Sequence, residues 1–392
     1  MLLNKVNIRS EFRERFNSEP LVVESPARVN LIGEHTDYND GFVLPAAIDK
    51  KITFAIASNS LQKIRMHALD MDQPEYEVKI PAPFRKSGRG WPDYILGVVD
   101  QLEKRAYSIS GFDCIFGGDI PIGAGLSSSA ALEGGLLTGL NALFDLNLSA
   151  MEMTKIGQQA ENNFVGVQCG IMDQFANLHG KENSVMCLDC RSLEYSHYPF
   201  KREGISILLC DTKVRRELAS SEYNIRRRQC EEGVSILRKF DPSIRNLRDV
   251  NQMLLEKHRD KLPEVIYNRC RFVLDENRRV LAACDFLARD DIESFGELMY
   301  RSHEGLRDLY EVSCRELNLL VDAAGKIDEV YGSRMMGGGF GGCTINLVEA
   351  QALEEVKRLI LQDYQRKINS SVEFYETNIS NGAALQGAIE KG

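Results

Sequence analysis

The stretch that decides the fold is rich in glycine and serine and reads Ile120-Pro-Ile-Gly-Ala-Gly-Leu-Ser-Ser-Ser-Ala130. It leads into a run of apolar residues, Leu132 to Phe144, that recur at helical spacing. Gly123 and Gly125 let the backbone approach a ligand closely, and the amides of the helix start then point at that ligand, which suits a polyphosphate. Taken alone, the stretch is equally typical of a glycine-rich turn with serine N-caps.

The same stretch predicts which residues would contact phosphates. They are Gly123, Ala124, Gly125, Leu126, Ser127, Ser128 and Ser129. The three consecutive hydroxyls add hydrogen-bond donors and a candidate ligand for Mg²⁺. No lysine follows the last glycine, so this is not a Walker A loop.

Strand and helix patterns alternate on both sides of this loop, which indicates an α/β (α+β) protein without internal repeats. We expect strands at 21–23, 52–57, 205–210 and 343–348, and helices at 132–144, 266–284 and 353–364. A further helix should begin at Ser149 and run towards Phe164, because Ser149 and Glu152 form a capping-box pattern.

A second segment, Ala27 to Tyr38, crowds charged and aromatic side chains around a single glycine. Its polar members include Arg28, Glu34, His35 and Asp37. A sugar presents many hydroxyls that both donate and accept hydrogen bonds, and carboxylates beside an imidazole supply that mixture. Apolar runs on either side predict that the core holds this segment in place, although such residues usually lie in a solvated loop.

The third segment, Met335 to Cys343, has five glycines in the six positions 337–342. It formally contains G-x-G-x-x-G, but a strand pattern follows it where a dinucleotide fold requires a helix, so we reject a nicotinamide or flavin site. A tight turn between a helix and a strand accounts for several of these glycines. Their density also predicts close backbone packing, with the phosphate loop as the candidate neighbour.

Bulk properties exclude several classes of function. The chain has 392 residues and a net charge of -9. Such an acidic protein is not expected to bind a nucleic-acid backbone, because neutralising phosphates requires a basic surface. No stretch approaches the roughly 18–20 apolar residues of a membrane span, so no membrane association is expected. Nothing in the sequence indicates an obligate protein partner.

Cysteine usage and length bear on location and domain count. Ten cysteines spread through a long chain do not form a small disulfide framework, which favours a reducing cytoplasm. Cys187 and Cys190 have redox or zinc spacing, but no second pair accompanies them, so we interpret them as ordinary strand or turn residues. The length predicts two domains, which we place at 1–190 and 191–392 although no linker marks the boundary.

In this order and spacing, the three segments resemble the motifs of the kinase superfamily that contains galactokinase, homoserine kinase, mevalonate kinase and phosphomevalonate kinase. The run from Arg28 to Tyr38 is similar to the narrower galactokinase signature. The similarity continues through Trp91-Pro-Asp-Tyr94, Glu161-Asn-Asn-Phe-Val-Gly166, Cys169-Gly-Ile-Met-Asp-Gln174, Asp189-Cys-Arg-Ser192 and Ser221-Glu-Tyr-Asn224. Two positions depart from the family pattern: Ala27 stands where glycine is usual, and Met336 stands where threonine is common.

The resemblance implies a two-domain fold. The N-terminal domain would be an α/β domain of the ribosomal-protein type, the C-terminal domain ferredoxin-like, and the site would lie in the cleft between them. It also implies that Asp173 faces the anomeric hydroxyl of a sugar as the base, with Arg28 beside it. Arg28 would offset charge that develops on the transferred phosphoryl group. Without the family, a buried Arg–Asp pair joining the domains would be the simpler interpretation.

Further contacts carry over from the same resemblance. The ligands of Mg²⁺ would be Ser129 and Glu161. The sugar contacts would be Glu34, His35, Asp37, Gly170 and Tyr223. Trp91 would flank the adenine of ATP, although Trp91 and Tyr94 are three apart on an expected helix and could both be core residues.

The leading hypothesis is the galactokinase reaction, in which the γ-phosphoryl group of ATP passes to the anomeric hydroxyl of galactose. A related sugar-1-kinase acting on N-acetylgalactosamine, arabinose or galacturonate would differ in the pocket rather than in the chemistry. A non-catalytic, galactose-sensing homologue would keep the fold alone. The intact serine loop from Ser127 to Ala131, together with Asp173 and Arg28, favours an enzyme.

Overall fold

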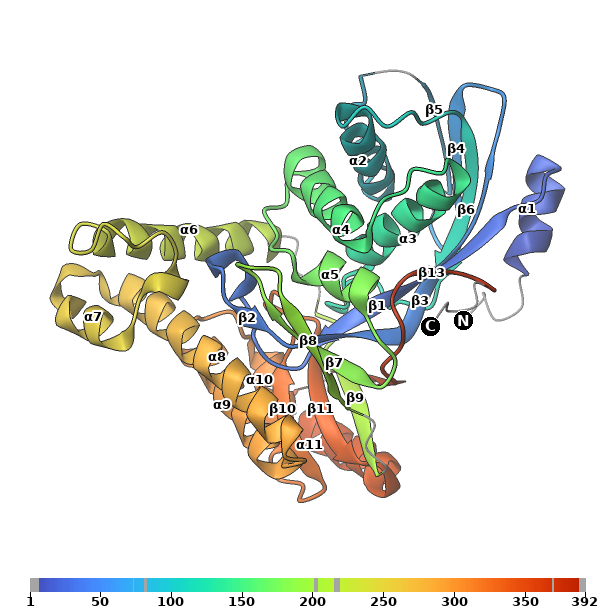
Figure 1. Ribbon diagram of the computed structural model, residues 1–392. Coiled ribbons are helices and arrows are strands. Elements are labelled where there is room, and N and C mark those ends of the chain that lie inside the picture. The colour runs from blue at the N-terminus through green and yellow to red at the C-terminus, as the bar shows by residue number, and fades with distance from the viewer. Residues whose placement is uncertain are drawn as a thin grey trace.

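The computed structural model describes residues 7–72, 74–80, 83–200, 204–214, 219–368 and 370–387. Within them the chain forms three β-sheets and the helices that cover them (Figure 1). The strands are β1 (Leu21–Asn30), β2 (Phe42–Val43), β3 (Pro45–Ser58), β4 (Lys63–Ala68), β5 (Glu75–Lys79), β6 (Phe112–Gly118), β7 (Ser184–Asp189), β8 (Tyr195–Pro199), β9 (Ile205–Asp211), β10 (Val330–Met335), β11 (Cys343–Glu349), β12 (Glu373–Thr377) and β13 (Ala384–Leu385).

The α-helices and shorter helical turns connect these strands. The α-helices are α1 (Ile8–Phe16), α2 (Trp91–Lys104), α3 (Ser128–Leu143), α4 (Ala150–Gln159), α5 (Met172–His179), α6 (Ala219–Leu237), α7 (Gln252–Lys257), α8 (Glu264–Ala288), α9 (Ile292–Asp308), α10 (Arg315–Ala324) and α11 (Leu353–Lys367). The short turns are η2 (Asp37–Asn39), η4 (Leu247–Asp249), η5 (Arg259–Lys261), η6 (Ala350–Ala352) and the π-helical turn η3 (Ala160–Val165). None of the described helices is long and apolar enough to cross a lipid bilayer.

The larger sheet has the strand order β13-β1-β3-β6-β4-β5 and carries helices on both faces (Figure 1). Only β4 and β6 pair in parallel; the other neighbours are antiparallel. Successive side chains of a strand point to opposite faces. Along β3, Phe54 and Ile56 therefore pack against α3, whereas Ala55 and Ala57 pack against Phe12 of α1.

The four-stranded sheet has the order β10-β11-β9-β12 and is antiparallel throughout. It is also covered on both faces. Along β9, Ile207 and Leu209 belong to the core that includes α8 and α9, whereas Leu208 and Cys210 belong to the core that includes α10 and α11. The first of these cores is continuous with that of the larger sheet, so the two sheets share one apolar interior.

Several expected elements are confirmed, and the first strand of the larger sheet is longer than expected. Ser149 and Glu152 form the capping box that starts α4, and the helix continues into η3 as far as Val165. The strand expected at 21–23 runs on to Asn30, so Arg28 lies on β1 rather than in a loop. The pairing of β1 with β3 shifts register between Pro26, which lies opposite Lys51, and Arg28, which lies opposite Ala47, so the extra residues of this β-bulge belong to β3 and lie across from Ala27.

The division into 1–190 and 191–392 stays a prediction. Strand β8, at 195–199, belongs to the third sheet, β2-β7-β8, whose other strands precede residue 190. Near its end the chain returns to the larger sheet, where β13 pairs with β1. The first strand of the four-stranded sheet is β9, which begins at Ile205.

Candidate active site

The glycine- and serine-rich stretch connects β6 to the first turn of α3. Gly123 and Gly125 have φ values of 73° and 80°, in the left-handed region that glycine adopts at little cost. Ser127 is also left-handed, with φ 56°, and it precedes the first helical residue, Ser128. The loop is tied to β1, because the Arg28 amide donates to the Leu126 carbonyl at 3.2 Å.

The third glycine-rich segment packs against this loop, as its composition predicts. A Cβ added at Gly337 would lie 3.3 Å from the carbonyl oxygen of Gly125, and one at Gly342 would lie 3.3 Å from that of Ala124. Both glycines also have positive φ values, 78° and 81°. Larger residues at these positions would therefore force the two loops apart, and the loop between β10 and β11 acts as a support for the phosphate loop.

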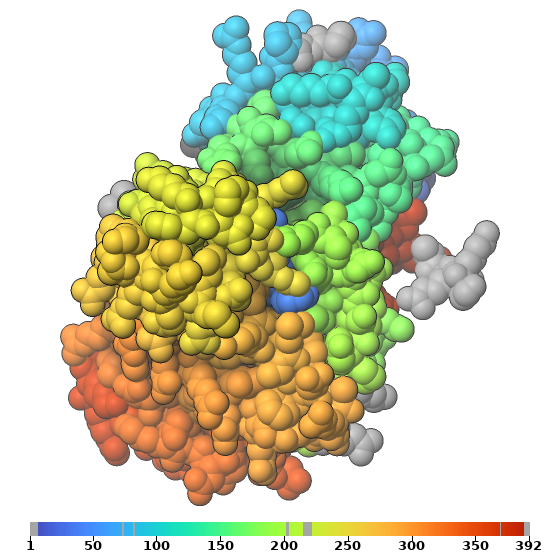
Figure 2. Space-filling view, turned by 60° about the vertical axis from the view of Figure 1, so that its left-hand side comes forward, coloured from blue at the N-terminus to red at the C-terminus, as the bar shows by residue number. Residues whose placement is uncertain are grey.

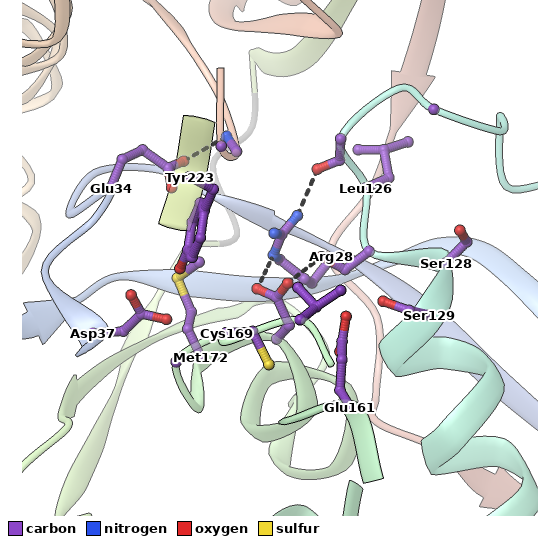
Figure 3. Close-up of a pocket in the computed structure, with 18 of the residues that line it drawn as sticks. Arg28, Glu34, Asp37, Leu126, Ser128, Ser129, Glu161, Cys169, Met172 and Tyr223 are labelled. Atoms are coloured by element: carbon purple, nitrogen blue, oxygen red, sulfur yellow. Dashed lines mark hydrogen bonds and ion pairs between the residues drawn. The ribbon is translucent and has the colours of Figure 1, made fainter. Parts of the chain in front are cut away.

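Arg28 joins three parts of the site at one point (Figure 3). Its Nε donates to Oδ1 of Asp173 at 2.8 Å, and its Nη1 donates to the carbonyl oxygen of Gly125 at 2.7 Å. The hydroxyl of Ser127 donates to the other carboxylate oxygen, Oδ2 of Asp173, at 2.5 Å. These three hydrogen bonds hold strand β1, the phosphate loop and the N-terminus of α5 together.

The opposite charges of Arg28 and Asp173 stabilise each other. Burial opposes the charged form of Arg28, but the carboxylates of Asp173 and Glu34 outweigh it and raise the pKa of Arg28. The Arg28 side chain is only 6% exposed, whereas that of Asp173 is 24% exposed and opens on the pocket. Asp173 is the second residue of α5, where the helix dipole favours a negative charge.

The second segment lies beside this pair, with Glu34 and His35 buried. His35 Nδ1 lies 2.8 Å from the hydroxyl of Tyr38, and its ring centroid lies 5.3 Å from that of Tyr223 on α6. Burial lowers the pKa of His35 to about 3, so the imidazole is neutral near pH 7 and can act only as a neutral hydrogen-bonding group.

Asp37 begins η2 and faces the backbone of Gly170. A Cβ added at Gly170 would overlap the carboxylate of Asp37, so only glycine fits there. Burial and the neighbouring charge of Asp173 raise the pKa of Asp37 to about 7. Gly170 therefore leaves room for a carboxylate that is poised to change its charge near neutral pH.

On the opposite side of Arg28, Glu161 and Ser129 point towards one another (Figure 3). Ser129 hydrogen-bonds to Glu161, and the amide of Gln174 donates to both Glu161 and Glu133 at 3.0 Å. Burial, with Asp173 next, raises the pKa of Glu161 to about 7, and burial, with Glu161 next, raises the pKa of Glu133 well above its ordinary value. No described basic side chain is among the groups that act on these two pKa values.

These groups line one pocket of about 350 Å³. At the surface, the region of α6 and α7 (yellow) meets the green part of the chain along a furrow in which blue residues show (Figure 2). Every residue proposed for the site lines the pocket except Ala124 and Trp91. Ala124 belongs to the loop but its side chain is buried, and the Trp91 ring packs edge-on against Phe116, with 5.2 Å between the ring centroids. A contact between Trp91 and adenine stays a prediction.

The pocket also contains residues that sequence reasoning did not assign to it. They are Tyr94, Pro121, Val167, Cys169, Met172, Gly337 and Gly338. Cys169 and Met172 lie in the same motif as Asp173, and Tyr94 follows Trp91 by one helical turn, so proximity to known motifs was the available signal. Two buried charged residues behind the lining, Glu133 and Arg334, also lie beside motifs, but nothing in those motifs indicates that a charged side chain is buried there.

Comparisons with known proteins agree along the whole chain. The galactokinase galactose-binding signature matches residues 10–58, the GHMP kinases N terminal domain matches residues 93–181, and the GHMP kinases C terminal domain matches residues 283–364. A galactokinase of Roseiflexus sp. (strain RS-1) is 40% identical over 383 residues, covering 97% of each chain. A galactokinase of Thermotoga neapolitana is 42% identical over 360 residues, covering 92% of this chain and 98% of the relative.

Solved structures give the same result. The crystal structure of Lactococcus lactis galactokinase complexed with galactose has a TM-score of 0.93 and 33% identity, covering 96% of this chain and 98% of that one. The Methanococcus jannaschii mevalonate kinase, at 19% identity and a TM-score of 0.64, shares the fold. The expected two-domain α/β kinase fold is confirmed, and the chain belongs to the galactokinase family of ATP-dependent sugar kinases.

Proposed function

We propose that this chain transfers the γ-phosphoryl group of ATP to the anomeric hydroxyl of galactose, giving galactose 1-phosphate and ADP. The observation that carries the proposal is the Arg28–Asp173 pair, which lies between the phosphate loop and the second segment. A phosphoryl group that moves from ATP at the phosphate loop to a sugar at the second segment would pass Arg28 and Asp173. Family membership supports the identity of the two substrates.

The sugar would bind between the second segment and α6. Glu34 and Asp37 would accept hydrogen bonds from ring hydroxyls, and His35 and Tyr223 would complete the polar wall. Gly170 supports this assignment, because any side chain there would displace Asp37. The mixture of acceptors and donors around one small cavity is what recognition of a polyol requires.

In the transfer step, Asp173 would accept the proton of the anomeric hydroxyl. The sugar oxygen would form a bond to the γ-phosphorus, and the bond from that phosphorus to the bridging oxygen would break, leaving ADP. Because phosphoryl transfer has a loose transition state, orientation and charge neutralisation contribute more than proton abstraction. Arg28 would supply both, since it fixes the carboxylate of Asp173 and places a positive charge beside the reacting groups.

The phosphates of ATP would bind to the loop from Gly123 to Ser129. Positive φ values at the two glycines and the half-buried start of α3, which lines the pocket, support this, because backbone amides there can point at an anion. Ser127 and Ser128 line the same pocket; the Ser128 hydroxyl would donate to a phosphate oxygen, and that of Ser127 keeps its hydrogen bond to Asp173. Trp91 would lie near the adenine.

The residues around Glu161 fit Mg²⁺, which we propose is held by Ser129 and Glu161. Glu133 and Glu161 are buried carboxylates that share one amide, and no described basic side chain offsets them. The described residues include no group of three or more His, Cys, Asp or Glu side chains placed to hold a metal, so water and phosphate oxygens would complete the shell. When bound, Mg²⁺ neutralises charge on the phosphates.

We also propose that the protein acts in the cytoplasm. All ten cysteines are free thiols, including Cys187 and Cys190. Free thiols of this number are typical of a reducing compartment.

A coupled assay of ADP release over a sugar panel tests the proposal. With saturating MgATP, galactose should give the highest kcat/KM, and glucose, which differs only at the 4-hydroxyl, should be much poorer. N-Acetylgalactosamine, arabinose and galacturonate belong in the same panel. If N-acetylgalactosamine exceeded galactose, the sugar assignment would be wrong while the kinase chemistry stood; if no sugar released ADP, the catalytic assignment would fail.

A further inference from the structure

The largest fully buried side chain of the described residues is that of Arg334, at the end of β10. Its Nη1 donates to the carbonyl oxygen of Asn30 at 2.8 Å, and its Nη2 forms an ion pair with Oε1 of Glu34 at 3.1 Å. Arginine is almost never fully buried unless it is paired. The ion pair with Glu34 therefore explains how Arg334 can be buried. Arg334 itself does not line the pocket.

A hydrogen bond reaches the same carboxylate oxygen. The backbone amide of Gly337 donates to Oε1 of Glu34 at 2.9 Å, which is the dashed line beside Glu34 in Figure 3. The ion pair and the hydrogen bond both come from the four residues 334–337, at the junction of β10 and the third glycine-rich segment. Since both contacts fall on Oε1, Oε2 is the oxygen left for a hydroxyl in the pocket that Glu34 lines.

A second buried carboxylate acts on Arg334 through its charge. Glu276 of α8 is fully buried, and although burial opposes its ionisation, Arg279 and then Arg334 outweigh it and lower its pKa. Oε1 of Glu276 accepts from the amide of Gly33 at 2.9 Å and from the hydroxyl of Ser302 at 2.7 Å. Glu276 therefore anchors the backbone just before Glu34, and its charge is complementary to that of Arg334.

We propose that Arg334 is a positioning residue for sugar selection: it holds Oε1 of Glu34, so that Oε2 presents a fixed acceptor to one sugar hydroxyl. The inference rests on the proposed function, in which Glu34 contacts the sugar. It assigns to the four-stranded sheet a part in choosing the sugar, in addition to its support of the phosphate loop. Arginine suits the task because its planar guanidinium can serve Asn30 and Glu34 at once, whereas a lysine ammonium is a single point.

The test compares galactose with its 2-, 3-, 4- and 6-deoxy derivatives, all of which keep the anomeric hydroxyl. Glu34→Gln identifies the hydroxyl that Glu34 reads, because the preference for galactose over one deoxy sugar, measured as a ratio of kcat/KM, should shrink. Arg334→Lys should shrink the ratio for that same deoxy sugar, by about tenfold, as expected when a weakened ion pair lets Oε1 of Glu34 move and the sugar hydroxyl lose a charged acceptor. The KM for galactose should rise while kcat and the KM for ATP change less.

Arg269→Lys is the matched control. Arg269 is another buried arginine, which pairs with Glu311 and the carbonyl of Leu309 and does not contact Glu34. Arg269→Lys should leave the kcat/KM ratio of galactose to each deoxy sugar unchanged. If Arg334→Lys lowered kcat/KM equally for all sugars, as a purely structural residue would, the inference would be overturned. If Glu34→Gln itself changed no ratio, the proposed sugar contact would fail first.

A double variant keeps the test decisive if Arg334→Lys does not fold. Glu34→Gln combined with Arg334→Met removes both charges, so it leaves no buried charge unpaired between them, and Glu276 keeps its bond to Arg279. If Arg334 acts through Glu34, the double variant should show the deoxy-sugar profile of Glu34→Gln alone. A change at a second deoxy sugar would show that Arg334 acts on the sugar by another route and would overturn the inference.

Discussion

Two sets of carboxylates, in or directly behind the lining of the same pocket, are treated differently by the fold. Asp173 and Glu34 each contact an arginine, at 2.8 Å and 3.1 Å respectively. Glu161 and Glu133 instead share the amide of Gln174, and burial raises the pKa of each. The first set has its counter-charge built into the chain, whereas the second set has none among the described residues.

In the proposed reaction, the difference would separate two tasks. A carboxylate that orients a hydroxyl must keep one geometry, and a paired arginine fixes it without an added ion. A buried carboxylate without a cation is costly, and its charged form is restored when a metal ion binds. On this proposal the sugar side of the site is preorganised, and the phosphate side would be completed when Mg²⁺ and ATP bind.

The largest expected effect comes from breaking the arginine-paired side at the reacting group. Asp173→Asn removes the proposed proton acceptor while it keeps the shape of the side chain, so kcat should fall by about 10²–10⁴-fold, the usual contribution of a general base. ATP binding and the melting temperature should change little. Steady-state kinetics on the purified variant, with nucleotide binding measured by calorimetry, provide the check.

Asp113→Asn is a suitable control, because Asp113 also pairs with an arginine, Arg65, but lies on β6 outside the pocket. Its kcat should stay near that of the wild type. A folded Asp173→Asn variant that turned over within a few-fold of wild type would show that Asp173 is not the base.

The second prediction addresses the unpaired set. Ser129→Ala and Glu161→Gln should each raise the Mg²⁺ concentration needed for half-maximal rate, by at least the roughly 10–100-fold that loss of an outer-shell partner costs. Titration of Mg²⁺ at fixed galactose and ATP measures it. Thr138→Ala serves as the control, since Thr138 lies on the same helix and bonds to the Gly134 carbonyl instead. Unchanged titration curves in both variants would remove these residues as ligands.

The sequence could predict those site residues that lie in short motifs. The serine loop and the segment of Arg28 were recognisable because each lies within a compact run of unusual composition, whereas Asp173 was identified only through the resemblance to the kinase superfamily. Local chemistry also predicted the capping box at Ser149. These features depend on neighbours within a few positions, which a sequence displays directly.

The buried charges behind the lining could not be predicted in this way. Glu133 lies in an apolar helix where a single acidic residue is normally taken for the solvated face, and only the packing of α4 and α5 around α3 buries it. Arg334 is 300 positions from its partner Glu34. Helical spacing also could not decide whether Trp91 or Tyr94 faces the pocket; Tyr94 lines it.

The smallest expected effect sharpens the comparison, because Asp37 belongs to neither set. It has no arginine hydrogen-bonded to it among the described residues, and it lies beside Asp173 rather than beside a metal position. Asp37→Ala should raise the galactose KM and shrink the galactose-to-glucose ratio of kcat/KM by roughly tenfold, since a lost charged acceptor is partly replaced by water. The KM for ATP should move little. An unchanged ratio would exclude Asp37 from sugar selection.

The pH dependence of the same residue provides an independent check on its role. Burial, and then the charge of Asp173, raises the pKa of Asp37 to about 7, so Asp37 is mostly ionised above that pH and mostly neutral below it. If the ionised form accepts the sugar hydroxyl, the galactose KM of the wild type should rise as the pH falls from about 8 to about 6, by up to tenfold per unit below the pKa. Asp37→Asn has no proton to gain and should flatten that slope while its KM stays high throughout. A wild-type KM that was constant over this range would mean that binding of galactose is indifferent to the charge of Asp37, and the carboxylate would then contribute shape rather than an anionic acceptor.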